Sequence, residues 1–386
     1  MSQQKSFYTT QFWLLCASSV LFMASFNMLL GELPHYLDSM GGQEYKGLII
    51  GLFALAALFS RPFSGRLADT IGRIPVMIVG ALVCIAAGFI YPLLNTISGF
   101  LILRFLHGFS TGFKPTGTTA YLADIVPAGK RGEAMGILGV AGSAGMAAGP
   151  AFGSFIATNY SIDLMFWASS IIAAASILVL MGMKETLPST VKFNPKLLLI
   201  HPKDVLEYDV WVPSIVMLLT VYSFGTILTV TPDFTDYLEL GNRGIFFTIT
   251  LCASIVVRLI SGKASDRLGR ENVLLFGTLS LVIAMVILGF TTTPILFYVG
   301  AVVFGIAAGV NSPTIFAWTT DLGKEHSIGK AMSTMFIALE SGILLGSVVG
   351  AYIYNNQIYQ LKYAYWFGAI LASLAFVVVL IKKLRT

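Results

Sequence analysis

Long apolar runs alternate with short polar segments along the whole chain. A membrane-spanning helix needs about 20 mostly apolar residues, and the runs have about this length. They predict twelve membrane-spanning helices, at residues 12–33, 47–68, 74–94, 98–125, 133–157, 162–183, 210–234, 244–264, 273–291, 294–319, 330–353 and 363–382. The pattern therefore predicts an all-α integral membrane protein.

Composition and charge agree with this prediction. Hydrophobic residues make up 56% of the chain and charged residues 11%, whereas soluble domains carry about 25% charged residues. Lys and Arg concentrate in alternate loops, with 19 on one side and three on the other. Because basic loops stay in the cytoplasm, we predict a multi-pass protein of the inner or plasma membrane with both termini cytoplasmic. The net charge of +5 is then a topology signal, and no nucleic-acid binding is predicted.

A charged, glycine-bounded segment at Gly65–Arg73 recurs 197 residues later at Gly262–Arg270. Other identities keep the same offset over most of both halves. Such a long repeat in register indicates a duplicated six-helix unit. We predict an N-terminal bundle, a polar cytoplasmic linker and a C-terminal bundle, at residues 1–184, 185–209 and 210–386.

The first copy of the segment has the form Gly-x-Leu-Ala-Asp-x-x-Gly-Arg and lies between the second and third predicted helices. With six plus six helices, it resembles the loop motif of the major facilitator superfamily, and the likeness covers the whole chain. The resemblance implies two six-helix bundles related by a pseudo-two-fold axis, with a central substrate site that opens to each side in turn. It also implies that the protein works as a monomer.

In that family, this loop belongs to a charge cluster that holds the inner gate shut. Asp69 is expected near the start of the third helix or in the loop before it, where a carboxylate suits a helix N-terminus. Asp124 and Arg131 are expected to complete the cluster. The alternative interpretation is that these charged residues only hold the loop in place and set the orientation of the helices. The predicted gate residues are Gly65, Arg66, Asp69, Gly72, Arg73, Asp124, Arg131, Asp266 and Arg270.

The fourth predicted helix carries basic residues inside the membrane, where a charge costs a few kcal/mol or more. Arg104 and His107 resemble the family's Arg-x-x-Gln-Gly element, with His in place of Gln. We predict that Arg104 faces the cavity, although its stem could also snorkel to the headgroups. His107 is either a proton-transfer group or a buried, hydrogen-bonded histidine. Lys114 is predicted to line the cavity, and its counterpart in the repeat is Asn311.

The fifth predicted helix has glycines at regular spacing, which let two helices approach closely. The spacing resembles the antiporter motif of the superfamily, with Ser154 where the motif ends in a second glycine. In the family this motif marks exporters. The alternative is ordinary small-residue packing. The motif residues are Gly136, Gly145, Gly149, Pro150 and Gly153.

Four further polar residues are candidates, Glu340 and Asn27 for the cavity and His35 and Asp233 for an outer gate. Glu340 lies about 16 Å into the eleventh predicted helix at 1.5 Å per residue, and a midspan acid suits a proton carrier. It could instead pair with Lys114, bind a cationic substrate, or form a neutral hydrogen bond. Asn27 occupies the first helix, where many relatives place the proton-carrying acid. His35 and Asp233 occupy matching positions after the first and seventh helices. They are predicted to form a proton-sensitive outer latch, unless both simply lie among the headgroups.

The sequence contains no phosphate-binding loop, metal-ligand cluster or nucleophile–base set. Its three cysteines, Cys16, Cys84 and Cys252, lie in apolar segments. No enzymatic activity, cofactor or metal is therefore predicted. The first hypothesis is a secondary transporter that exports a small organic compound, a drug or metabolite, in exchange for protons. The alternatives are metabolite or sugar uptake, by proton symport or facilitated diffusion, and a transport-inactive sensor or assembly factor.

Overall fold

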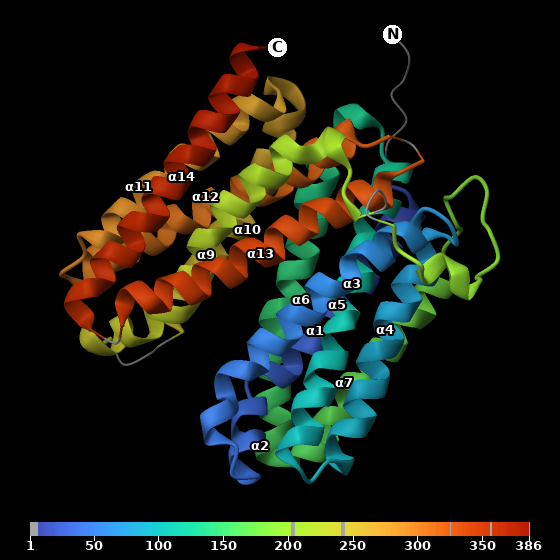
Figure 1. The fold of residues 1–386 in the computed structure, drawn as a ribbon, viewed down its shortest axis with the longest axis horizontal. Coiled ribbons are helices and arrows are strands. Elements are labelled where there is room, and N and C mark those ends of the chain that lie inside the picture. Colours follow the sequence, from blue (N-terminus) through green and yellow to red (C-terminus); the bar gives the residue numbers. More distant parts are fainter. Residues whose placement is uncertain (1–6, 202–204, 241–243, 325, 356, 386) are drawn as a thin grey trace. The chain divides into compact units, whose positions relative to one another are not determined.

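A computed structural model describes residues 7–201, 205–240, 244–324, 326–355 and 357–385. Within these ranges the secondary structure is helical throughout (Figure 1). The long helices are α1 (Thr10–Leu30), α3 (Lys46–Ala68), α4 (Arg73–Ile90), α5 (Ile97–Ile125), α6 (Arg131–Asn159), α7 (Ile162–Met181), α9 (Trp211–Tyr237), α10 (Ile245–Leu268), α11 (Arg270–Gly289), α12 (Pro294–Leu322), α13 (Ile328–Tyr354) and α14 (Leu361–Leu384), and a short α2 (Leu33–Ser39) follows α1. The predicted all-α membrane fold is confirmed.

Each predicted span corresponds to one of the long helices within a few residues. In the described part of the chain, eleven helices are long and apolar enough to cross a membrane. The remaining long helix, α5, has 29 residues but carries Arg104, Lys114 and Asp124. The first predicted span ends early, because the helix stops at Leu30 and restarts at Leu33 as α2.

The chain divides into two compact units by its internal contacts. Unit 1 consists of Met1–Ala128, Leu138–Glu207 and Lys324–Thr334, and unit 2 consists of Gly129–Ile137, Tyr208–Gly323 and Met335–Thr386. The first turns of α6 therefore belong to unit 2, and the rest of α6 belongs to unit 1. For α13 the assignment is reversed, with the first turns in unit 1 and the rest in unit 2. The predicted domain boundaries at residues 184 and 210 stay a prediction.

The same four helix pairs form the interior of each unit. In unit 1, α3 packs on α5, α5 on α4, α4 on α7 and α7 on α1. In unit 2, α10 packs on α12, α12 on α11, α11 on α14 and α14 on α9. These pairs are related by the 197-residue offset, so the internal repeat is also a repeat of packing.

Glycines allow these helices to approach closely. A Cβ on Gly80 of α4 would lie 2.6 Å from the backbone nitrogen of Lys114 of α5. In unit 2, a Cβ on Gly277 would lie 2.2 Å from Oδ1 of Asn311. The position of Lys114 in one unit is thus the position of Asn311 in the other, and both lie inside their unit.

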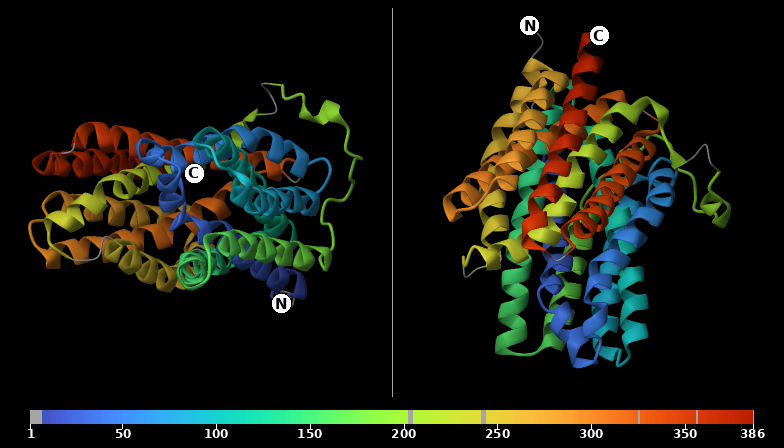
Figure 2. Two further views of the ribbon diagram at one scale, coloured as in Figure 1. Left: turned by 90° about the horizontal axis from the view of Figure 1, so that it is seen from below. Right: turned by 60° about the vertical axis from the view of Figure 1, so that its left-hand side comes forward.

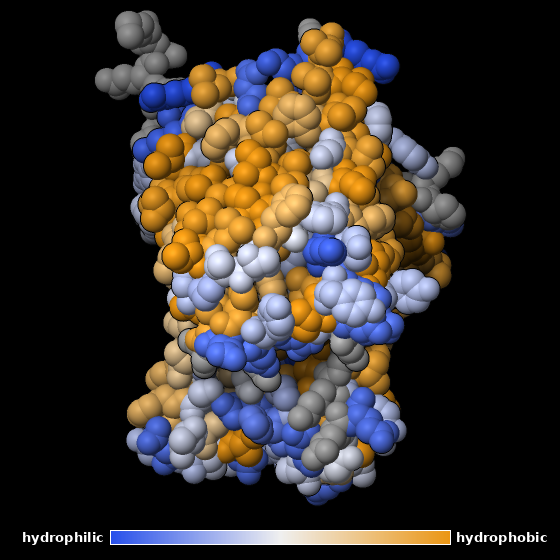
Figure 3. All heavy atoms as spheres, turned by 90° about the vertical axis from the view of Figure 1, so that its left-hand side faces the viewer, coloured by the Kyte–Doolittle hydropathy of each residue, from blue (hydrophilic) through white to orange (hydrophobic). Residues whose placement is uncertain are grey.

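Large hydrophobic side chains are also common on the surface. Figure 3 shows a broad hydrophobic area on one face, bordered by polar residues. Exposed residues such as Ile102, Ile171, Ile260 and Phe276 are unfavourable in water but suit contact with lipid chains. The polar segment after α7 runs outside the helices of unit 1 (Figure 2).

Candidate functional site

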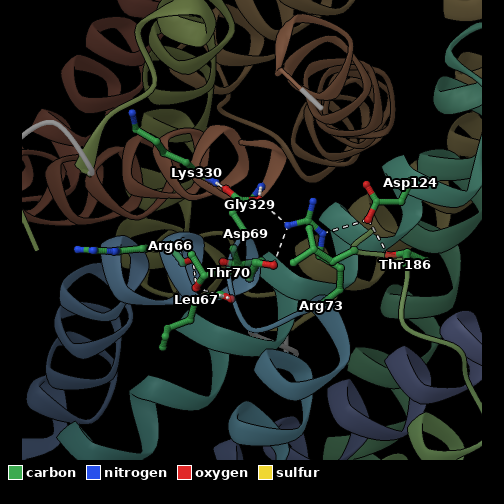
Figure 4. A network of polar contacts seen from close by, with 12 residues as sticks. Arg66, Leu67, Asp69, Thr70, Arg73, Asp124, Thr186, Gly329 and Lys330 are labelled. Atoms are coloured by element: carbon green, nitrogen blue, oxygen red, sulfur yellow. Dashed lines mark hydrogen bonds and ion pairs between the residues drawn. The ribbon is translucent and has the colours of Figure 1, made fainter. Parts of the chain in front are cut away.

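The first copy of the repeated loop lies at one end of unit 1, where Asp69 ends α3 (Figure 4). Its carboxylate accepts hydrogen bonds from the backbone N–H groups of Gly329 at 2.7 Å and Lys330 at 2.8 Å. These N–H groups belong to the first turn of α13. The first N–H groups of a helix lack partners within the helix and carry partial positive charge. Asp69 therefore caps α13.

Arg73 extends this contact into a network. Its guanidinium forms an ion pair with Asp69, donates to the carbonyl of Ala68 at 2.8 Å, and pairs with Asp124 at 3.0 Å. Asp124 also accepts a hydrogen bond from the hydroxyl of Thr186 at 2.6 Å. Burial raises the pKa of Asp69, and the charge of Arg73 acts against this rise. The network joins the ends of α3 and α5, the start of α4, and the linker (Figure 4).

Asp69 lies in the loop before the third span, as predicted, but the helix that it caps is α13. The start of α4 is capped by Glu185 from the segment after α7. Glu185 accepts the N–H of Arg73 at 3.0 Å and the N–H of Ile74 at 2.9 Å. Gly72 has φ +122°, and a Cβ there would lie 2.6 Å from the Glu185 carboxylate. A glycine is thus required both by the backbone and by the cap.

We expect Glu185→Ala to lower the free energy of unfolding by about 1 kcal/mol, the usual cost of losing a helix cap. Thermal unfolding of the purified protein in detergent measures the change. Glu185→Gln is the matched control, because the amide keeps one acceptor for the two N–H groups. Equal melting temperatures for Glu185→Ala and the wild type would show that this cap contributes nothing.

The second copy of the loop forms an equivalent network in unit 2. Asp266 accepts the backbone N–H groups of Gly132 and Glu133, both at 2.8 Å. These residues are in the first turn of α6. Arg270 pairs with Asp266 at 2.6 Å and with Asp321 at 2.9 Å. The repeat therefore produces two carboxylate caps, Asp69 on α13 and Asp266 on α6.

Arg131 is predicted to complete a cluster with Asp124, and this stays a prediction because the two residues belong to different units. Its guanidinium donates to the carbonyl of Thr320 at 2.6 Å and pairs with Asp321 at 3.3 Å. Arg131 therefore belongs to the cluster of unit 2, and Asp124 belongs to the cluster of unit 1.

The other residues of the first loop also make specific contacts. A Cβ on Gly65 would lie 2.6 Å from Cβ of Ser333 and 3.0 Å from the carbonyl oxygen of Gly329. Gly65 therefore lets α3 approach the start of α13. Arg66 donates a hydrogen bond to the carbonyl of Leu199 in the linker.

The motif glycines of α6 pack against the backbones of other helices. Side chains at Gly145, Gly149 and Gly153 would place Cβ atoms 2.4, 2.6 and 2.2 Å from carbonyl oxygens of α1. A Cβ on Gly136 would lie 2.5 Å from the carbonyl of Arg258 in unit 2. The carbonyls of α1 are those of Val20, Ala24 and Met28. Close α1–α6 contact is what the spacing around Pro150 was expected to permit.

The same kind of packing occurs in unit 2. Gly342 and Gly346 of α13 approach carbonyls of α9 in this way, at 2.6 and 2.0 Å. Close packing alone therefore does not distinguish an export motif. The departure at Ser154 has a role of its own, because its hydroxyl donates to the carboxylate of Glu32 at 2.5 Å.

The basic residues of α5 lie inside unit 1. The exposed fraction of Arg104, of His107 and of Lys114 is 1% each. Nε of Arg104 donates to the carbonyl of Ile49 at 2.8 Å, and its guanidinium lies 4.2 Å from the ring centre of Phe53. Arg104 therefore does not snorkel to the headgroups. Whether these residues face a substrate cavity stays a prediction.

Asn27 and Asn311 satisfy part of their hydrogen bonding within their own unit. Asn27 donates to the carbonyl of Met23 one turn earlier, at 2.7 Å. Asn311 donates to the carbonyl of Gly277 at 3.2 Å, and its buried Oδ1 has no hydrogen-bond donor among the described residues.

The remaining candidates are divided between the units. Glu340 is half-buried on α13 in unit 2. His35 is exposed on α2 in unit 1, and Asp233 is exposed on α9 in unit 2, where it interacts with Tyr354. The proton-carrying role of Glu340 and the His35–Asp233 latch therefore stay predictions.

Comparison with known proteins gives consistent results. The model of the Major Facilitator Superfamily matches residues 15–246 and 214–386. The chain is similar to the multidrug resistance protein MdtG of Escherichia coli (strain K12 / DH10B), with 26% identity over 381 residues, 93% of this chain and 90% of that protein. MdtG of Enterobacter lignolyticus (strain SCF1) is 26% identical over 354 residues, 86% of this chain and 83% of that protein.

Solved structures share the fold at lower identity. The human organic anion transporter MFSD10 (TETRAN) has a TM-score of 0.83 at 19% identity, covering 96% of this chain and 98% of that one. The proton:xylose symporter XylE has a TM-score of 0.79 at 14% identity, covering 95% and 94%.

Proposed function

Because this chain belongs to the major facilitator superfamily, we propose that it exports a small organic compound, a drug or metabolite, in exchange for protons. It is a multi-pass membrane transporter and not an enzyme. Export is supported by the similarity to proteins named for multidrug resistance. The observation that carries the proposal is the full spacing of the antiporter motif in α6, with Gly149 followed by Pro150, whereas the matching position of α13 is Gly346 followed by Ser347. We further propose a monomer in the inner membrane, with both termini cytoplasmic.

The two carboxylate caps suggest how the inner gate works. Asp69 holds the first turn of α13, whose remainder belongs to unit 2, and Asp266 holds the first turn of α6, whose remainder belongs to unit 1. Each cap therefore ties one unit to a helix that continues in the other. We propose that both caps break and re-form once in each transport cycle, and that the cavity opens alternately to the two sides.

Proton coupling is assigned in this proposal to Glu340, with Arg104 as a cationic group of the cavity. An intramembrane acid is expensive and is a functional candidate for that reason. A carboxyl that binds a proton on one side and releases it on the other drives the substrate in the opposite direction. Uptake by proton symport is the alternative, since a symporter such as XylE has the same fold.

Transport by purified protein in liposomes tests this function. With an imposed pH gradient, we expect a panel of cationic, zwitterionic and anionic compounds to contain at least one that moves against the proton flux. Glu340→Gln is expected to reduce proton-driven accumulation at least ten-fold, while downhill exchange of the same compound continues. Glu44→Gln, at an exposed acid of the loop before α3, is the control.

Two results would contradict the proposal. If the substrate moves together with protons, the protein is a symporter. If Glu340→Gln keeps the wild-type response to the pH gradient, Glu340 does not carry the coupling.

A further inference from the structure

Four polar residues occupy one face of α5 in the interior of unit 1. Arg104, His107, Ser110 and Lys114 are three or four residues apart, which places them on the same side of a helix. Ser110 is completely buried, and the other three are 1% exposed. This polar row extends about 15 Å, at 1.5 Å per residue, through the interior of the unit.

At one end of the row, His107 is held between two polar groups. Its Nδ1 lies 3.4 Å from the guanidinium of Arg104 and 3.4 Å from the hydroxyl of Tyr91. A guanidinium can only donate, so Nδ1 is the acceptor and the proton of the neutral ring is on Nε2. This Nε2 lies 3.4 Å from Sγ of Cys84. His107 therefore accepts on one side and donates on the other.

At the other end of the row, Lys114 has too few partners for an ammonium group. Its Nζ donates to the hydroxyl of Ser18 at 2.6 Å, and Ser18 contacts the hydroxyl of Ser176 at 2.9 Å. An ammonium has three donors, and Ser18 is the one acceptor that the described residues offer it. Burying an ammonium without a counter-ion is strongly unfavourable. A neutral amine at Lys114 avoids this penalty.

The groups around Lys114 are polar but carry no negative charge. Cys84 of α4 lies close enough to interact electrostatically with both Lys114 and Arg104. On α5 itself the other charged or titratable groups are Arg104 and His107 before Lys114, and Tyr121 and Asp124 near the end of the helix. Helices α1 and α7 contribute the hydroxyls of Ser18 and Ser176. No described carboxylate contacts the amine.

Ser110 connects the two ends of the row. Its buried hydroxyl lies on the α5 face between His107 and Lys114 and interacts with the thiol of Cys84. A thiol is only a weak hydrogen-bonding group, and apart from it the hydroxyl has no hydrogen-bond partner among the described residues. Ser110 and Cys84 therefore lie between the imidazole of His107 and the amine of Lys114.

We propose that Lys114 is a proton-binding site inside unit 1, reached through His107, Cys84 and Ser110. The bound species is a single proton: the amine becomes an ammonium on binding and an amine again on release. Only N–H, O–H and S–H bonds change. An anion is the other ligand that would suit a buried amine, but Lys114 and Ser110 are enclosed. A proton can pass along hydrogen-bonding groups without an opening.

The repeat supports a specific role for this position. Asn311 occupies the equivalent place in unit 2, in contact with Gly277 as Lys114 is with Gly80. Packing can therefore be satisfied by an uncharged side chain, and unit 1 alone carries a group that titrates there. The part of this inference that concerns coupling rests on the proposed proton exchange, whereas proton binding by Lys114 does not.

Direct titration tests proton binding. The full chain, labelled with ¹³C at lysine Cε and placed in lipid nanodiscs, is followed by NMR from about pH 6 to pH 9. Exposed lysines remain ammonium over this range, because their pKa is about 10.4. We expect one signal, missing from Lys114→Asn and from Lys114→Arg, to move between the amine and ammonium positions. A Lys114 signal that stays at the ammonium position, or that moves when chloride replaces gluconate, would overturn the proposal in favour of a fixed cation or an anion site.

Transport tests its role in coupling. Lys114→Asn places the residue of unit 2 in unit 1, and Lys114→Arg keeps a permanent charge; both are expected to lose proton-driven accumulation at least ten-fold. Lys184→Asn, at an exposed lysine after α7, is the control for loss of charge. If the wild type couples transport to protons and both Lys114 variants do so equally well, the coupling role is lost. If Lys114 titrates but the wild type ignores the pH gradient, proton binding stands and the proposed exchange function fails.

Discussion

Asp69→Ala is expected to abolish measurable transport and to lower the free energy of unfolding by about 3 kcal/mol. Removing one partner of a buried ion pair leaves the other charge without compensation and typically costs about 3–5 kcal/mol. Arg73 is fully buried, but it keeps Asp124 at 3.0 Å, so the lower end of the range applies. The first turn of α13 loses the acceptor of two N–H groups at the same time.

Asp69→Asn separates the two contributions. The amide oxygen still accepts a backbone N–H, since Asn is as good a cap as Asp, but the charge facing Arg73 is gone. We expect Asp69→Asn to lie between the wild type and Asp69→Ala in melting temperature. The equivalent change Asp266→Ala in unit 2 should have a similar effect, because Arg270 keeps Asp321 as a partner. A fully active Asp69→Ala would show that the first cap has no part in the gate.

The helices were predictable because a bilayer constrains every backbone group to find a partner within its own helix. Long apolar runs therefore translate directly into spans, as α7 and α12 illustrate. The interruption after α1 was not predicted. The predicted span ran without a break to residue 33, whereas the helix stops at Leu30 and restarts as α2.

The partners of the gate residues were much less predictable. Asp69 was correctly identified as an acid suited to a helix N-terminus, but the first N–H group that it accepts, that of Gly329 in α13, lies 260 positions later. Arg131 pairs with Asp321, a residue that the predicted gate set did not include. The sequence does not show which helix ends meet.

Residues of the linker were missed altogether. Glu185 caps α4, and Glu207 lies 3.6 Å from the amine of Lys330. Neither belongs to a motif, and both look like solvated charges in a polar segment. The sequence gives only an indirect signal for the Glu185 cap. Helix α4 begins with Arg73 and has no acid in its first turn, so an acceptor for its first N–H groups had to come from another segment.

Gly149→Ala is expected to reduce stability by about 1–2 kcal/mol and to abolish transport, although it adds a single methyl group. The new Cβ would lie 2.6 Å from the carbonyl oxygen of Ala24 and 3.0 Å from the backbone nitrogen of Met28. Backbone atoms cannot rotate away as a side chain can, so α1 and α6 must separate. Overpacking of this kind costs about 1–3 kcal/mol, which outweighs the gain of about 1 kcal/mol from replacing Gly by Ala within a helix.

Gly142→Ala makes the same chemical change two turns earlier on α6 and should have the opposite sign. Its Cβ would meet only a side-chain atom of Met23, at an unstrained 3.9 Å, so the helix-propensity gain remains. Melting temperatures in detergent and transport in liposomes compare the two variants. If Gly149→Ala and Gly142→Ala behave alike, the α1–α6 contact is not tight in the membrane. The motif then loses the mechanical role on which the export proposal depends, because helices that tolerate separation there cannot form a tight contact against proton leak.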